Sequence, residues 1–477
     1  MFSAVTRASG NRNRVTALPM LGFVYILFRP VSNGKILLPI LLGLALCGLV
    51  TGVLSKHRLA RPLMLFLLIQ LLFATVFALV GVGNPGVGDQ LVAFLGFPVV
   101  FWMMIYGISE RMLARVIWAV AIGCTIVGLT LIVYVGYRQG VLPQLVPARL
   151  LETQTDAFFT ATRTGRSGGA VRFYGLATLA AGTPIWVASL LVPHDRLLPP
   201  LRMRLLAAVS CAVAALVAGR QAIVVTSILA PVFFWLVSTL IGRARADAEK
   251  LSRELLLRAR RRRIGLVVAM VAGVLIVGKF SFRTTPISGS TVTAAFRTLG
   301  AAYLGTGAAT DQDTLIRQEE SRALLAGFGS SPIFGHGLGA ALADYRRDDL
   351  RPWNFELQYH MLLFDSGLIG VLFAVAAVGV LIYAARRAMR RRPDLAGCLA
   401  VTSVGCLAML AAAASNPYLQ APGYHWALYL PLAVINVALT SSVPSPAPAA
   451  DAELGATPPP RPRSESDQSR RMVESSS

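Results

Sequence analysis

Long apolar runs separated by short polar connections dominate the pattern of residues along this chain. Most runs are about 15 to 25 residues long, the length that an α-helix needs to cross the roughly 30 Å hydrocarbon layer of a membrane. We expect about twelve such helices, at residues 17–28, 36–54, 63–82, 91–108, 116–135, 173–191, 205–217, 222–241, 264–280, 358–384, 396–414 and 426–439. The pattern predicts an all-α polytopic membrane protein.

The polar segments divide the chain into five parts. Residues 1–16 precede the first run, residues 17–280 hold the first nine helices, and residues 358–441 hold the last three. Between them, residues 281–357 form one large polar loop, in which we expect short helices. Residues 442–477 are rich in Pro, Ala, Ser and Arg, which is typical of a disordered tail.

Basic residues mark every second connection between the runs. The positive-inside rule places these connections in the cytoplasm, together with both termini. They hold Lys56, Arg58 and Arg61; Arg111 and Arg115; Arg196, Arg202 and Arg204; and the basic runs 258–263 and 386–392. The loops 83–90, 138–172, 281–357 and 415–425 then face outward, and the even number of helices agrees with this arrangement.

The overall composition supports the membrane class and narrows the chemistry. Hydrophobic residues are 55% and charged residues 14% of the 477-residue chain, too few polar groups for a soluble fold of this size. The net charge of +22 is spread over the basic connections, so we do not predict a nucleic-acid partner. The five cysteines all lie inside apolar runs as small hydrophobes, and we predict neither a metal site nor a cofactor.

Two arginines are candidates for binding an anion. Arg220 stands in strongly apolar sequence, where an arginine costs at least about 2.5–3.5 kcal/mol unless it has a partner or a polar cavity. It either extends to the outer headgroups or clamps a phosphate with its guanidinium fork. Arg317 lies near the start of a predicted helix, with Asp311 and Asp313 as its cap and acidic first turn and glycines at 327 and 329 at its end. The alternative to anion binding is that Arg317 pairs with Glu320 one turn later on the helix surface.

The exit of the large loop holds two further candidates. In residues 331–339, one proline fixes φ and three glycines permit positive φ, so we expect a tight loop that brings backbone N–H groups and His336 near a ligand. A compact turn back to the membrane is the alternative. Glu356 lies just before a helix, with His360 one turn later, and in a closed cavity Glu356 would suit a general base.

Together these segments resemble the O-antigen polymerase and O-antigen ligase superfamily of bacterial inner-membrane glycosyltransferases. In that pattern an arginine is followed fifteen residues later by a Pro-x-x-Gly-x-Gly turn, and then by a tyrosine and a Gly-Leu-Ile-Gly segment. The matching residues are Arg317, Pro332, Gly335, Gly337, Tyr359 and 367–370. A family arginine in a Ser-Arg-Gly context matches Arg220, although Gly219 replaces the serine. Glu356-Leu357 stands where ligases often have His-Asn, which favours a polymerase.

The resemblance implies an inner-membrane protein with cytoplasmic termini and a periplasmic loop 281–357. The donor would be a polyprenyl-diphosphate-linked glycan and the acceptor another lipid-linked repeat unit, with membrane lipids and a chain-length regulator as further partners. Arg220, Arg317 and Arg172 would bind the diphosphate, and Glu356 or His336 would accept the hydroxyl proton, without metal or cofactor. The alternatives are a ligase that transfers glycan to lipid A-core or to protein, and a transporter without covalent chemistry.

Overall fold

The structure is a computed structural model that describes residues 19–31, 34–138, 142–146, 174–192, 195–217, 221–241 and 312–441. Within these ranges the chain is helical and has no β-strand. Six helices are long and apolar enough to cross a membrane: Lys35–Leu54, Arg61–Val80, Val87–Tyr106, Glu110–Tyr137, Gln358–Arg391 and Pro393–Ala413. The chain is therefore a multi-pass membrane protein, as the sequence predicts.

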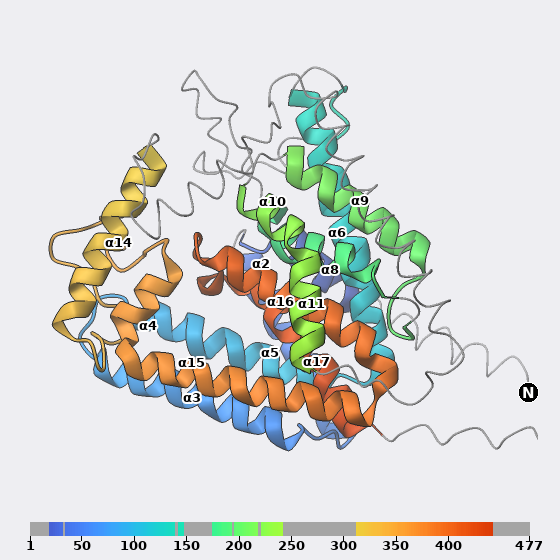
Figure 1. Cartoon of the computed structure of the whole chain (residues 1–477), viewed down its shortest axis with the longest axis horizontal. Helices are drawn as coiled ribbons and strands as arrows, with labels where there is room; N and C mark the ends of the chain where they lie inside the picture. Colours follow the sequence, from blue (N-terminus) through green and yellow to red (C-terminus); the bar gives the residue numbers. More distant parts are fainter. Residues whose placement is uncertain are drawn as a thin grey trace, which may run out of the picture. The chain divides into compact units, whose positions relative to one another are not determined.

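The helices follow the predicted apolar runs closely (Figure 1). A short apolar helix, Pro19–Phe28, comes first. The others in the first half are α2 (Gly34–Leu54), α3 (Arg61–Val80), α4 (Val87–Leu91), the π-helical turn η1 (Val92–Gly96), α5 (Phe97–Tyr106), α6 (Glu110–Arg138), η3 (Tyr174–Ala177), α8 (Thr178–Ser189), α9 (Leu201–Val217), α10 (Gln221–Ile228) and α11 (Ala230–Ile241). The predicted helix 264–280 lies outside the described residues.

The second half of the described chain begins with the large loop. Its helix α14 (Gln312–Ser330) agrees with the short helix expected there. It is followed by α15 (Gln358–Arg391), η4 (Pro393–Leu395), α16 (Ala396–Ala413), η5 (Tyr418–Gln420), η6 (Pro422–Tyr424) and α17 (His425–Thr440). The earlier part of the loop, up to residue 311, and the tail 442–477 lie outside the described residues.

Helix α8 lies in the core. All twelve of its residues are buried, and it packs against α6, α9 and α16. An apolar helix of only twelve residues is too short to cross the bilayer by itself and is typical of a buried core helix. Three cysteines, Cys124, Cys211 and Cys398, are buried in the same core as expected, whereas Cys47 is exposed on α2.

Helices α3 and α15 lie side by side and antiparallel (Figure 1). Phe73 and Phe77 of α3 pack edge to face against Phe373 of α15, with ring centroids 6.0 and 6.2 Å apart. Leucines on the outer faces of α3 and α15, such as Leu68 and Leu372, are half exposed, which is typical of helices that face lipid. The end of α3 and the start of α15 meet the large loop, and this edge holds the candidate site.

Candidate functional site

Helix α15 is interrupted at Gly367, where the backbone has φ 57° and ψ −158°. This combination is essentially restricted to glycine, because a side chain would collide with the backbone there. Two carbonyls on the N-terminal side of the break are paired with the glycine-rich loop. The N–H of His336 donates to the carbonyl of Phe364 at 3.0 Å, and the N–H of Gly337 donates to that of Asp365 at 2.8 Å.

The same loop also satisfies the donors on the other side of the break. The N–H groups of Leu368 and Ile369 donate to the carbonyls of Pro332 and Ile333, at 2.9 and 3.1 Å. Interrupting a helix in a membrane is tolerated only where such substitute partners exist. The Pro-x-x-Gly-x-Gly segment and the Gly-Leu-Ile-Gly segment of the sequence pattern therefore form one hydrogen-bonded unit.

The loop is fixed on its other side by the end of α3. The N–H of Leu338 donates to the carbonyl of Phe77 at 2.8 Å, and the side-chain amide of Asn84 donates to the carbonyls of His336 and Leu338 at 2.9 and 3.1 Å. Gly337 has φ 81° and lies so close to the backbone of Gly81 that a Cβ would not fit. The expected tight loop with positive φ is confirmed.

His336 is held by helix α14 and by α15. Its Nε2 lies 2.9 Å from the carbonyl of Gly327 and 3.1 Å from the hydroxyl of Ser330, and its ring stacks on Phe364 at 4.6 Å. A carbonyl only accepts, so this contact assigns the proton of a neutral ring to Nε2. Nδ1 then carries the lone pair and is able to accept a proton.

Arg317, Arg347, Glu320 and Glu356 form a charged cluster between α14 and the start of α15. The Nε of Arg317 donates to Glu356 at 3.1 Å, and one Nη of Arg347 donates to the other oxygen of Glu356 at 2.6 Å. The second Nη of Arg347 donates to Glu320 at 3.1 Å. The expected alternative pair of Arg317 with Glu320 is wrong, because Glu320 faces the interior and pairs with Arg347.

Glu320 is the buried member of this cluster. Its side chain is fully buried, and its second oxygen accepts the N–H of Leu357 at 2.7 Å, directly before α15 begins. Burial raises the pKa of Glu320, although the bond from Leu357 and the charge of Arg347 act in the opposite direction. Burial and the charge of Glu320 also raise the pKa of Tyr345 to about 12.

The two arginines differ in how many of their guanidinium nitrogens are bonded to carboxylates. Both terminal nitrogens of Arg347 are bound to carboxylates. Arg317 uses only Nε, and in the described part of the chain its two terminal nitrogens have no hydrogen-bond partner. Its side chain is 20% exposed, and these nitrogens are not among the fully buried unpaired polar atoms of the described residues. Arg317 is therefore the guanidinium that this cluster offers to an anion.

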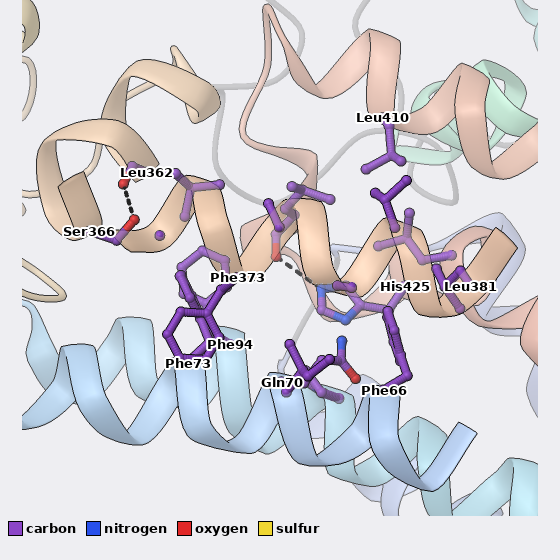
Figure 2. A pocket seen from close by; sticks show the side chains of 18 of the residues that line it. Phe66, Gln70, Phe73, Phe94, Leu362, Ser366, Phe373, Leu381, Leu410 and His425 are labelled. Atoms are coloured by element: carbon purple, nitrogen blue, oxygen red, sulfur yellow. Dashed lines mark hydrogen bonds between the residues drawn. The ribbon is translucent and has the colours of Figure 1, made fainter. Parts of the chain in front are cut away.

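An apolar pocket of about 560 Å³ lies between α3, α15 and α17 (Figure 2). Of its lining residues, Tyr359 is the nearest in sequence to the charged cluster, three residues after Glu356. Figure 2 shows Ser366 toward one end of the pocket and Leu381 toward the other, with Gln70 and His425 between them. Both polar groups have partners: Gln70 donates to the hydroxyl of Tyr429 at 3.1 Å, and the Nε2 of His425 lies 2.9 Å from the carbonyl of Leu419. The pocket thus offers an apolar wall that leads away from the charged cluster.

The structure brings together only some of the predicted site residues. Arg317 and Glu356 are in contact, and His336 lies in the adjoining loop. Glu356 precedes α15, so it does not share a helical face with His360, contrary to the expectation. Arg220 and Arg172 lie outside the described residues. Within the described ranges no cluster of three or more His, Cys, Asp or Glu side chains is suited to hold a metal ion.

Sequence reasoning missed Arg347 and the buried role of Glu320. One signal was present: Glu320 belongs to a stripe with Arg317, Ser321 and Leu324, at the helical spacing of a buried face. No family model matches the chain, and no curated protein is detectably similar to it.

Proposed function

We propose that this protein is a glycosyltransferase of the bacterial inner membrane, with about twelve transmembrane helices and both termini in the cytoplasm. It joins polyprenyl-diphosphate-linked oligosaccharide units into O-antigen or exopolysaccharide at the periplasmic face. The observation that carries the proposal is the guanidinium of Arg317, bonded to Glu356 through Nε alone, together with an apolar pocket whose lining includes Tyr359, three residues after Glu356. A lipid diphosphate needs both, a cation for its head and an apolar surface for its chain.

Arg317 is the proposed ligand of the diphosphate. Glu356 holds its Nε, and Glu356 is itself held by Arg347, so the guanidinium is oriented before substrate binds. Preorganised cations at the position where negative charge develops are a principal source of catalysis. Arg220 and Arg172, outside the described residues, remain predicted as further cations of this site.

In the proposed reaction, a hydroxyl oxygen of the acceptor sugar attacks the anomeric carbon of the donor. A new C–O glycosidic bond forms, and the bond between the anomeric carbon and the diphosphate oxygen breaks. The diphosphate leaves with the electron pair, and Arg317 stabilises its charge. The proton of the attacking hydroxyl goes to a base of the protein, for which Glu356 and His336 are the candidates.

The two candidate bases differ in their free acceptor sites. Each oxygen of Glu356 already accepts one bond from an arginine and has one lone pair left. His336 has Nδ1 free when Nε2 donates to Gly327. Replacing Glu356 by Gln preserves its shape but removes its charge, and replacing His336 by Gln removes the lone pair at Nδ1. A loss with His336→Gln that exceeds the loss with Glu356→Gln assigns the base to His336; full activity of His336→Gln leaves Glu356 as the base, since Glu356→Gln also weakens the hold on Arg317.

The test is the polysaccharide profile of a deletion strain complemented with variants. We expect single-repeat product in the deletion strain, long chains with the wild type, and no long chains with Arg317→Ala or Glu356→Gln. Arg322→Ala is the matched control, because Arg322 is exposed on the same helix α14. Full polymerisation by Arg317→Ala would disprove the assigned site. Long chains that accumulate on the lipid carrier of the deletion strain would instead identify a ligase, and unattached precursor confined to the cytoplasmic face would identify a transporter.

A further inference from the structure

A second pocket, of about 620 Å³, lies at the opposite ends of α3 and α15. It is formed by the connection between α2 and α3, the start of α6 and the last turns of α15 and α17. These include two of the basic connections that the sequence pattern assigns to the cytoplasmic side. Helix α15 has 34 residues, so this pocket is separated from the charged cluster by roughly 50 Å along the helix.

Five cationic side chains line this pocket: Lys56, Arg58, Arg61, Arg387 and Arg391. Two come from the connection between α2 and α3, one from the first residue of α3, and two from the end of α15. They come from segments more than 300 residues apart in the chain and meet only through the fold. Like charges around one cavity repel one another, so the arrangement is stabilised when an anion enters.

The described residues around this pocket do not neutralise these cations. Glu110 is the one carboxylate among the lining residues, and it is already bound by the buried Arg392 at 3.2 and 3.3 Å and approached by Arg196 at 3.5 Å. Of the five cations, Arg387 donates to the hydroxyl of Tyr383 at 3.2 Å. Within the described ranges none of the five makes an ion pair with a carboxylate.

The base of the pocket is rigid and polar. Asn436 of α17 is buried and accepts the N–H of Ala60 at 3.0 Å, which ties the start of α3 to the end of α17. The hydroxyl of Thr440 donates to the carbonyl of Asn436 at 2.7 Å, and Ser109 adds another hydroxyl to the lining. The five cations are themselves exposed, and they surround this hydrogen-bonded polar base.

We propose that this pocket binds a phosphate-bearing anion at the cytoplasmic face of the membrane. Arginine matches phosphate oxygens with a planar pair of donors, and basic pockets between helices at this depth suit anionic headgroups. The source is either the phosphodiester of an anionic lipid or a soluble phosphate ester. Leu54, which ends α2 two residues before Lys56, is an apolar side chain that is 78% exposed, which favours the lipid.

The test measures binding to the purified full-length protein in neutral detergent. Phosphatidylglycerol, phosphatidylethanolamine and sn-glycerol 1-phosphate are titrated separately and followed by native mass spectrometry and thermal shift. The variant Arg58→Gln/Arg61→Gln/Arg391→Gln removes three pocket cations. The control Arg111→Gln/Arg115→Gln/Arg390→Gln removes three exposed arginines on the same predicted side that do not line the pocket.

We expect the pocket variant to lose at least tenfold in affinity for phosphatidylglycerol and the control less than twofold. Tight binding of the lipid alone identifies a headgroup site, and comparable binding of glycerol phosphate identifies a soluble ligand. Equal losses in the two variants, or no preference for phosphatidylglycerol or glycerol phosphate over phosphatidylethanolamine, would overturn the proposal. If the triple variant does not fold, the single variant Arg391→Gln is used, and inorganic phosphate is added as a competitor of the lipid. A loss of affinity in this variant supports the proposal, and unchanged affinity contradicts it.

Discussion

Replacing Gly367 by Ala tests whether the interruption of α15 is required by the fold. The residue has φ 57° and ψ −158°, a conformation that costs a residue with a side chain about 1–3 kcal/mol. An added Cβ would also meet the carbonyl of Ile333, so the loop would have to move. That movement would weaken the bonds donated by Leu368 and Ile369, each contributing about 1 kcal/mol. The expected loss of stability is about 3 to 5 kcal/mol.

The matched control is Gly379→Ala in the same helix. A Cβ at Gly379 meets nothing within 4 Å, and alanine favours a helix interior over glycine by about 0.5–1 kcal/mol. Thermal unfolding in one detergent at one scan rate compares the two variants with the wild type. We expect the melting temperature to fall by several degrees for Gly367→Ala and to stay level or rise for Gly379→Ala. Equal melting temperatures for both variants would refute the reasoning.

Three further predictions concern other polar groups. The pKa of Glu320 is higher in the folded protein than in the unfolded chain, so the free energy of unfolding falls as pH rises above about 4.5. Melting temperatures measured across pH should show this slope, and Glu320→Gln should flatten it. Asn436→Leu leaves the N–H of Ala60 unpaired and should cost about 1–3 kcal/mol in denaturant unfolding, whereas Asn436→Asp should cost less. Arg347→Gln should reduce polymer yield less than Arg317→Ala, because both its terminal nitrogens are bound within the protein.

Local periodicity predicted the helices but not their interruption. Helix α15 begins at Gln358, as the apolar pattern indicates, yet it continues to Arg391 instead of ending near residue 384. The last two turns are rich in Ala and Arg, which have high helix propensity. The arginines are not apolar, so the hydrophobic pattern stops before the helix does. The break at Gly367 could not be read from the sequence, because glycine within an apolar run is also compatible with a continuous helix.

The candidate site depended on contacts between distant residues. The contact of Arg317 with Glu356 spans 39 residues, and helical spacing alone offered the nearer Glu320 instead. Spacing reports which residues share a helical face but not whether that face is buried or what it meets. The glycine-rich loop was predictable in its conformation because positive φ depends on residue type, whereas its partners in α3 were not.

The attachment of the glycine-rich loop to α3 constrains the order in which the protein can assemble. The carbonyls that Asn84 binds lie 252 to 254 residues later in the chain. At typical rates of synthesis this separates the two partners by roughly 10 to 50 s. During that interval the end of α3 near Val80 has been made but lacks the loop that completes it. Chains that end before residue 340 therefore lack these hydrogen bonds, and we expect this end of α3 to be less stable in them.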